Sequence, residues 1–494
     1  MIHLLLAAAL GIWAGDPAPP DTDTLHAGGT PETAVRDTVV PTECRARLPA
    51  LTDPCALLER TLRIQDRGRG HMGFRAPWSG GTGDPRADIH ETLAVSSDLH
   101  LQAGLGLQSR RGARRFIAEN PGSVAVGDDA GPAWSGRARL HRAGWGEVIV
   151  RAEGPGDALA EPASTPANLT GAEIRELAYV AAPGPVYLWL GRRAPGYGTG
   201  TGGGIVLTGE VPIDGIGVGS RAPGRLPGWG AGLGEWSFET MLGRVHDNAD
   251  IGRPWFGAGR WVWAPASGVD LGFNRGAFFS GEGAPGMNAS RFISLLFGAH
   301  HREGEGNQVV QMTNQTASFD LSIRRSVGGF PALLHAEIGL EDSSGAWKRS
   351  PAVVTGFEMA HPARPLRWGV ERTYFSNSPL HGRWYRHTLY REGWSDRGRP
   401  LGHPLAGEGT EWLLHSTWVG GADRAVRAGL RTRTRTDRHS YAPTLEGSGW
   451  GGLVQAEHPV RAFTLAVAGD LERLAGGPTV WHGRIEIRWR TSPP

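Results

Sequence analysis

The chain has 494 residues, with 75 glycines, 19 tryptophans, 39% hydrophobic residues and a formal net charge of +2. Glycine at about twice its average usage but without a three-residue period excludes collagen, and the hydrophobic content excludes a largely disordered chain. The balanced charge gives no reason to expect a nucleic-acid partner, and 2 cysteines without a CxxC pair indicate neither a disulfide scaffold nor a metal site.

Residues 1–15 are expected to form a signal peptide. The apolar run from Leu4 to Ala14 is too short to span a bilayer and has the length of a secretory signal core. A short hydrophobic tail on a cytosolic protein is the alternative, because no Lys or Arg precedes the run. No other apolar stretch approaches the roughly 20 residues of a membrane helix.

The segment that follows divides into two parts. Residues 16–52 are rich in Pro, Thr, Asp and Gly and are expected to form a flexible leader. Residues 53–84 contain one stretch of helical spacing, Pro54 to Asp66, which predicts a short helix. Cys44 and Cys55 can pair in an oxidising compartment or remain free thiols.

From about residue 85 the hydrophobic period changes to two, which is the period of a β-strand. Apolar and polar residues alternate in segments 99–108, 334–341 and 484–490. Near residue 430 three arginines alternate with threonines: Arg431, Arg433 and Arg435. We predict that these arginines line a polar interior, because a nucleic-acid patch would not follow a period of two.

Residues 85–494 are predicted to form a transmembrane antiparallel β-barrel. Strand-like segments separated by Gly, Pro, Asn and Asp clusters recur without intervening helices, so the region is all-β. A soluble sandwich or propeller is the alternative architecture. The polar faces mix glycine with Arg, Glu and His, which suits a barrel lumen better than a surface in bulk water. The length of the region predicts about 18 strands.

Aromatic residues near the segment ends are expected to form the girdles at both membrane interfaces. Ordinary core packing or cross-strand pairing is the alternative. The residues are Trp236, Trp255, Trp263, Trp368, Tyr374, Tyr390, Trp412 and Trp418.

No catalytic constellation emerges from the sequence, and we expect a protein that is not an enzyme and has no cofactor. The GxSxG nucleophile elbow is absent, and the HETLA segment at His90 lacks the second histidine of a zinc protease. His300 and His301 are adjacent, so they face opposite sides of a strand. The glycine-rich run at Thr199 precedes a strand rather than a helix, which argues against a phosphate-binding loop.

The segment from Trp384 to Glu411 has the composition of a polysaccharide-binding surface. Aromatic rings pack on the apolar faces of sugars, and charged groups hydrogen-bond their hydroxyls and carboxylates. We expect this segment to be an outward-facing loop; girdle aromatics and solvated charges are the alternative. The candidate binding residues are Trp384, Tyr385, Arg391, Trp394, Asp396, Arg397 and Glu408.

Four segments along the chain carry a set of motifs in a fixed order: Gly191–Val218, Leu233–Asn248, Asn314–Met359 and Trp384–Trp412. Together they resemble the Wzi-type capsule assembly family of Gram-negative outer-membrane proteins. The resemblance implies an outer-membrane barrel with a small helical element at its periplasmic end. It also implies a lectin-like, non-catalytic role in attaching or organising capsule or exopolysaccharide, with surface polysaccharide and outer-membrane lipids as partners.

Three other functions compete with this hypothesis. A porin-like channel would use the arginines near residue 430 as a basic eyelet that selects anions. A barrel enzyme acting on lipid or glycan would need a catalytic cluster at one rim. A secreted lectin or glycanase would remain soluble.

Overall fold

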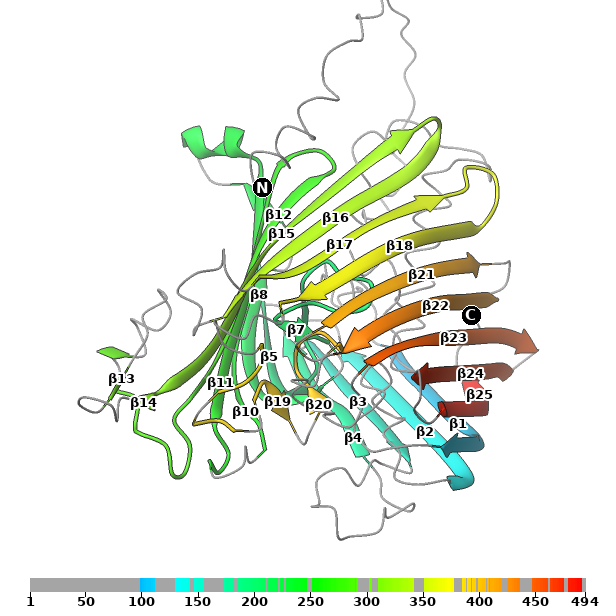
Figure 1. Cartoon of the computed structure of the whole chain (residues 1–494), viewed down its shortest axis with the longest axis horizontal. Helices are drawn as coiled ribbons and strands as arrows, with labels where there is room; N and C mark the ends of the chain where they lie inside the picture. The colour runs from blue at the N-terminus through cyan, green and yellow to red at the C-terminus, as the bar shows by residue number, and fades with distance from the viewer. Residues whose placement is uncertain are drawn as a thin grey trace, which may run out of the picture. The chain divides into compact units, whose positions relative to one another are not determined.

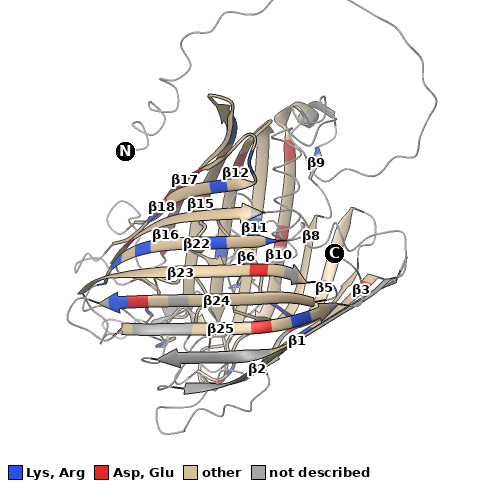
Figure 2. Cartoon of the chain, turned by 90° about the vertical axis from the view of Figure 1, so that its right-hand side faces the viewer, with Lys and Arg blue, Asp and Glu red and all other residues tan. Residues whose placement is uncertain are grey.

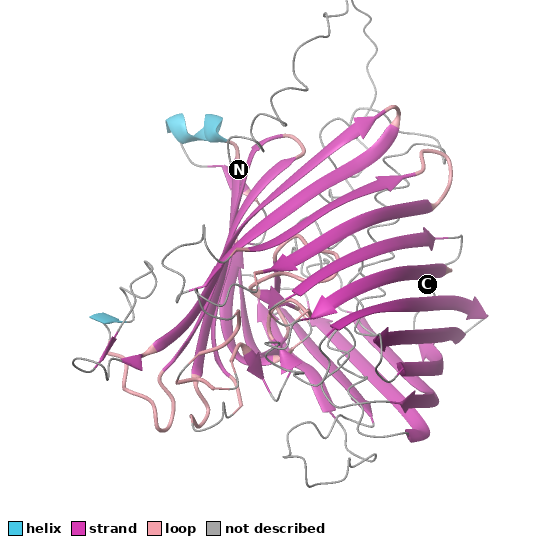
Figure 3. Cartoon of the chain, viewed as in Figure 1, coloured by secondary structure: helices cyan, strands magenta, loops and turns pink. Residues whose placement is uncertain are grey.

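The structure, a computed structural model of the chain, consists almost entirely of β-strands (Figure 3). No helix in the part of the chain that it describes is long and apolar enough to cross a membrane. It describes residues 98–111, 129–142, 146–154, 173–181, 185–209, 211–220, 223–225, 228–246, 251–288, 290–291, 302–303, 310–341, 351–376, 384–387, 389–391, 393–396, 399–405, 407, 409–419, 424–435, 447–460, 463–474 and 479–490. The signal peptide (1–15), the leader (16–52), the helical segment (53–84) and the two cysteines lie outside these residues, so those expectations stay predictions.

Eighteen long strands form the wall of a closed barrel (Figure 1). Each strand pairs antiparallel with the next wall strand along the chain, and β1 pairs with β25 to close the ring. The wall strands are β1 (Asp98–Arg111), β2 (Asp129–Arg142), β3 (Gly146–Gly154), β4 (Glu173–Ala181), β5 (Val186–Arg193), β8 (Ile213–Ser220), β10 (Glu235–Arg244), β11 (Trp255–Ala266), β12 (Val269–Phe279), β15 (Thr313–Val327), β16 (Phe330–Glu341), β17 (Ala352–Ala360), β18 (Leu366–Phe375), β21 (Gly409–Val419), β22 (Ala425–Arg435), β23 (Gly447–Val460), β24 (Phe463–Leu474) and β25 (Thr479–Arg490). The predicted all-β barrel of about 18 strands is confirmed.

The two ends of the barrel differ in the length of their connections. At one end the turns are short, as between β11 and β12 or β15 and β16. The exception is the connection from β8 to β10, which holds β9 (Gly224–Arg225) and the 3₁₀ helix η2 (Gly228–Leu233). At the other end long segments join β5 to β8, β12 to β15 and β18 to β21, and the hairpin of β13 (Arg302–Glu303) and β14 (Val310–Gln311) lies in one of them. In bacterial barrels the longer connections face the cell exterior.

The wall is apolar outside and polar inside, as the alternation predicts. Figure 2 shows charged residues as separate short segments along wall strands such as β22, β24 and β25. On β22, Leu430 is 62% exposed whereas its neighbour Arg431 is 3% exposed. On β25, Ile485 is 54% exposed and Glu486 is 0% exposed. A continuous band of exposed Leu, Ile, Val and Trp would be unfavourable in water, so this outer face is suited to lipid.

The predicted girdle aromatics fall into three groups, one of which, Trp255, Trp263 and Tyr374, is partly exposed. Trp236, Trp368, Trp412 and Trp418 are exposed on the outer face, and Trp236 stacks on Trp263 with ring centroids 5.4 Å apart. The assignment of Tyr390 to a girdle is wrong, because its ring is 0% exposed and packs inside the barrel at 5.7 Å from the ring of Phe278. Its segment folds into the lumen instead of continuing along the wall.

Candidate functional site

Two connections from the long-loop end fold inward and meet inside the barrel (Figure 1). We call their described residues, 196–209 and 384–407, the inner plug. The first contains β6 (Gly196–Tyr197) and β7 (Leu207–Thr208), and the second contains β19 (Ser395–Asp396) and β20 (Arg399–Pro400). Thr208 N donates to the carbonyl of Leu401 at 2.7 Å, so a strand-like bond joins the two connections.

The inner plug has its own apolar core, which the two connections build together. The Tyr385 hydroxyl donates to the carbonyl of Ile205 at 2.6 Å, and Trp394 Nε1 donates to the carbonyl of Val206 at 2.8 Å. Aromatic rings of the wall complete this core, since the Trp394 ring lies 5.4 Å from that of Phe256. The fully buried members of the two connections are Tyr197, Ile205, Val206, Trp384, Tyr385, Tyr390, Trp394 and Leu405.

Wall carboxylates bind the backbone of the first connection. Glu371 on β18 accepts from Gly202 N at 2.8 Å and also from the backbone N–H of Thr201. Glu337 on β16 accepts from Ile205 N at 3.1 Å through Oε1. Bonds between an N–H and an ionised acceptor are stronger than neutral ones, particularly where water is excluded. These carboxylates therefore fix the glycine-rich run against the wall.

Glycine is required where this run meets the wall and itself. Gly198 has φ of +111°, and a Cβ there would overlap the carboxylate of Glu337. A Cβ at Gly204 would overlap the carbonyl of Tyr197. The run Thr199–Gly204 is thus a close-packed anion-binding loop whose anions are carboxylates of the protein itself.

The second connection is held by the same chemistry. Glu341 on β16 accepts from Tyr385 N at 2.7 Å. Asp396 lies in the plug and accepts from His246 N, after the end of β10, at 2.7 Å, and its Oδ1 lies 3.0 Å from His246 Nδ1. The plug therefore donates hydrogen bonds to the wall at some points and accepts them from residues near the wall at others. Both connections are anchored by such bonds.

His387 in the second connection lies outside the membrane-spanning strands and is held in its neutral form. Its Nδ1 accepts from Leu389 N at 3.1 Å and from Tyr390 N at 3.3 Å, which a protonated ring nitrogen could not do. Burial lowers the pKa of His387 to about 4, because the charged ring loses its hydration.

The three arginines near residue 430 lie on the inner face of β22, each 3–4% exposed. Glu472 on β24 receives all three: Arg435 Nη1 lies 2.7 Å from Oε1, Arg433 Nη1 lies 3.0 Å from Oε2 and Arg431 Nη2 lies 3.4 Å from Oε2. Arg433 also pairs with Glu411 on β21. We call these five residues the arginine cluster.

The predicted polysaccharide-binding residues have unequal positions. The structure brings Trp384, Tyr385, Trp394 and Asp396 together inside the plug, where each is at most 2% exposed, so none presents a surface to a sugar in this conformation. Arg391 is exposed. Arg397 and Glu408 lie outside the described residues. The segment does start at the long-loop end, but its described part folds into the lumen rather than outward, because its aromatic rings find apolar partners there.

Sequence reasoning missed the wall carboxylates that hold the plug, namely Glu337, Glu341 and Glu371. A usable signal exists in the sequence. These acids occupy the inward positions of alternating strands, and the neighbouring inward positions offer too few arginines to pair with all of them. An excess of inward acids indicates that other donors, such as loop N–H groups, must reach them.

The plug residues offer packing and hydrogen bonding inside the barrel. In the part of the chain that the structure describes, no group of three or more His, Cys, Asp or Glu residues has the geometry to hold a metal ion. The described site is therefore a plug anchored to the inner wall by hydrogen bonds.

Comparisons with known proteins give a consistent result. The family model described as capsule assembly protein Wzi matches residues 170–475. Among solved structures, Wzi of Escherichia coli, an outer-membrane protein involved in group 1 capsule assembly and a carbohydrate-binding β-barrel, has a TM-score of 0.63 and 15% identity over 89% of this chain and 98% of its own. A BenF-like porin from Pseudomonas fluorescens Pf-5 has a TM-score of 0.49 and 11% identity over 81% of this chain and 99% of its own. No curated protein sequence matches the chain.

Proposed function

Because the chain belongs to the capsule assembly protein Wzi family, we propose that its barrel binds or organises a surface polysaccharide, capsule or exopolysaccharide, without catalysing a reaction. The protein is a β-barrel of the outer membrane. The observation that carries the proposal is the inner plug, in which two connections from the exterior end meet in the lumen through the bond from Thr208 to Leu401. A barrel closed in this way is built to hold a polymer at its outer face and not to pass solutes.

The arginine cluster supports binding over conduction. A basic eyelet requires guanidinium groups that face open water and attract passing anions. Here Arg431, Arg433 and Arg435 are buried and share the carboxylates of Glu411 and Glu472. Their charge is neutralised by carboxylates of the wall. The porin-like alternative therefore lacks the basic eyelet on which it depended.

Within the proposed polysaccharide site, Arg391 is the described residue suited to direct contact. It is exposed, and it lies three residues before Trp394, whose buried ring fixes that part of the chain. A guanidinium can donate two parallel hydrogen bonds to a sugar carboxylate. Trp384, Tyr385, Trp394 and Asp396 then act as positioning residues, and Arg397 and Glu408 remain members of the proposed contact set.

The test is retention of polysaccharide on cells that produce the full-length protein. Arg391→Ala should lower retention by about 10-fold, which corresponds to the loss of one charge-assisted hydrogen bond pair. Arg364→Ala is the matched control, because Arg364 is an exposed arginine in the turn between β17 and β18 at the opposite end of the barrel. Equal retention by cells with and without the protein would reject the proposed function. Wild-type retention by Arg391→Ala would remove only Arg391 from the proposed contact set.

A further inference from the structure

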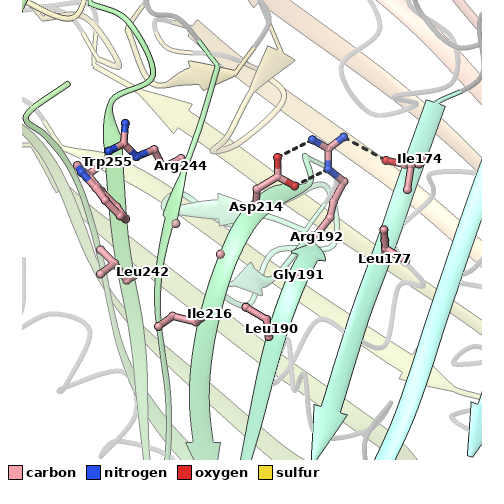
Figure 4. Close-up of a pocket in the computed structure, with 12 residues that line it drawn as sticks. Ile174, Leu177, Leu190, Gly191, Arg192, Asp214, Ile216, Leu242, Arg244 and Trp255 are labelled. Carbon is pink, nitrogen blue, oxygen red and sulfur yellow. Dashed lines mark hydrogen bonds and ion pairs between the residues drawn. The ribbon is translucent and has the colours of Figure 1, made fainter. Parts of the chain in front are cut away.

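The outer face of the barrel carries a groove over strands β4, β5, β8, β10 and β11, with a volume of about 670 Å³ (Figure 4). Its floor is apolar and open: Leu177 is 47% exposed, Leu190 is 60% exposed and Ile216 is 52% exposed. Leu242 and the ring of Trp255 extend this floor. We call this feature the rim groove.

Three glycines on neighbouring strands line the rim groove. Gly191 on β5 is paired with Gly215 on β8, and Gly215 is paired with Gly243 on β10. Outward residues flank each glycine along its strand, as Asp214 and Ile216 flank Gly215, so backbone lines the groove at this row and the outward side chains border it on either side. The outer face therefore has a depression here. Contact with bulk lipid does not require one, since a smooth outer face would serve equally well.

Two guanidinium groups border the upper end of the rim groove. Arg192 forms a bidentate pair with Asp214, with Nε to Oδ1 and Nη2 to Oδ2 both at 2.6 Å. Arg244 lies over the ring of Trp255 at 4.2 Å from its centroid, and its Nη1 donates to the carbonyl of Arg253 at 3.0 Å. No carboxylate of the described residues pairs with Arg244, so the two guanidinium groups and one carboxylate leave an excess positive charge.

The groove lies at the exterior end of the membrane-spanning wall. Arg192 and Arg244 are at the ends of β5 and β10, which run toward the long connections, and Trp255 begins β11 at the same end. An amphipathic tryptophan and outward arginines at this height match the boundary between acyl chains and headgroups. In a Gram-negative outer membrane this boundary belongs to the outer leaflet, whose lipid is a glycolipid with phosphates on its sugars and several acyl chains.

We propose that the rim groove binds this phosphorylated glycolipid, lipid A. An acyl chain lies along Leu177, Leu190 and Ile216, and a sugar phosphate accepts hydrogen bonds from Arg244 beside the Arg192–Asp214 pair. Arginine suits this task because its planar fork matches phosphate oxygens and because stacking on Trp255 holds it in place. The inference goes beyond polysaccharide binding, since it concerns the lateral face of the barrel and not its outer opening.

A second outer-face groove provides an internal contrast. It has a volume of about 820 Å³ and lies over β18 and β21 to β25, where Leu414, Leu430 and Val454 line it. Among the residues that the structure describes, no Arg, Lys, Asp or Glu borders it. It can accept an acyl chain but offers no charge to a phosphate, so it separates generic lipid contact from recognition of lipid A.

The experiment measures lipid binding to the purified full-length protein in nanodiscs by native mass spectrometry. The probes are bisphosphorylated lipid A, dephosphorylated lipid A and phosphatidylglycerol. Arg244→Ala should raise the apparent Kd for bisphosphorylated lipid A by about 10-fold, and Ile216→Trp, which fills the groove without removing charge, should have a similar effect. Dephosphorylated lipid A and phosphatidylglycerol should bind the wild-type protein as weakly as bisphosphorylated lipid A binds Arg244→Ala.

Two matched controls accompany these variants. Arg372→Ala removes another outward arginine, which lies 5.5 Å from the ring of Trp412, and Leu430→Trp fills the second groove. Both should bind lipid A as the wild type does. Unchanged lipid A binding by Arg244→Ala and Ile216→Trp would overturn the proposal, and so would equal binding of phosphatidylglycerol. Polysaccharide retention by Arg244→Ala should stay at the wild-type level. Failure of the lipid A proposal can therefore be distinguished from failure of the proposed function.

Discussion

Two groups of buried carboxylates, on adjoining parts of the inner wall, differ in their main partners. On β16 and β18, Glu337, Glu341 and Glu371 accept from the backbone of the inner plug. On β21 and β24, Glu411 and Glu472 pair with arginines of the wall itself. The first group connects segments up to 170 residues apart, as in the bond from Thr201 to Glu371, whereas the second connects strands that are neighbours or next neighbours.

This difference separates stability of the wall from closure of the lumen. Removing a carboxylate of the arginine cluster leaves buried charge unpaired, which is a large penalty for the barrel as a whole. Removing one of the first group leaves neutral N–H groups of the plug unsatisfied, which is a smaller penalty and falls mainly on the plug, although Glu371 also lies 3.0 Å from Nε2 of His335 in the wall. The first group is therefore expected to act mainly on the plug and the second mainly on the wall.

The largest effect is expected from Glu472→Gln, which leaves three buried arginines with Glu411 as their remaining carboxylate in the cluster. The barrel should lose about 3–5 kcal/mol of stability. The temperature at which the folded band converts to the unfolded band on a gel measures this loss. Glu235→Gln is the control, since its pair with Arg225 is solvent-exposed and should contribute about 0–1 kcal/mol. Equal conversion temperatures for the two variants would contradict the account of the arginine cluster.

Trp394→Ala should destabilise the plug by about 3–5 kcal/mol, the usual cost of removing a buried tryptophan, while the wall persists. The variant loses the bond to the carbonyl of Val206 and the ring contact with Phe256. Channel recordings in planar bilayers should show steady current. Trp412→Ala, which removes a tryptophan exposed on the lipid face, should leave the current at the wild-type level. If Trp394→Ala shows no steady current, this ring does not hold the plug in place.

Glu371→Gln weakens the anchor of the glycine-rich run by about 1.5–3 kcal/mol, because the N–H groups of Thr201 and Gly202 lose an ionised acceptor. We expect brief openings in single-channel recordings and a smaller fall in the temperature of barrel unfolding than for Glu472→Gln, because the wall contact between His335 and residue 371 also weakens. A lowered unfolding temperature without channel openings would assign Glu371 to the wall instead of the plug.

The smallest effect concerns pH. The pKa of His387 is about 4 in the folded protein, below its ordinary value of 6.5. The unfolded loop therefore binds the proton more readily, so plug stability is complete above pH 6.5 and declines as pH falls toward 4. Partial exposure limits the loss to about 1–2 kcal/mol. Acidification should therefore loosen the plug and induce channel current in the wild type. His387→Gln should remove the share of this current that comes from His387, whereas His361→Gln in the turn after β17 should not change it. Identical pH profiles for His387→Gln and the wild type would exclude His387 as the source.

The wall was predictable from sequence because its pattern is local. Leu430 next to Arg431, and Ile485 next to Glu486, already reveal strands with one apolar and one polar face. The plug was not, because Trp384 and Trp394 look the same in sequence whether they join a girdle, contact a sugar or fill a lumen. Their position depends on complementarity with wall residues far away in the chain, and no periodicity records it.

The central claim, that the two inward connections close the barrel, is tested most directly by single-channel conductance of the purified full-length protein. The comparison is with a variant in which residues 384–405 are replaced by a short Gly-Ser linker, which removes one half of the plug. We expect little steady current for the wild type and large, stable current for the variant. Large, stable current in both would contradict the central claim, because the lumen would then be open despite the plug.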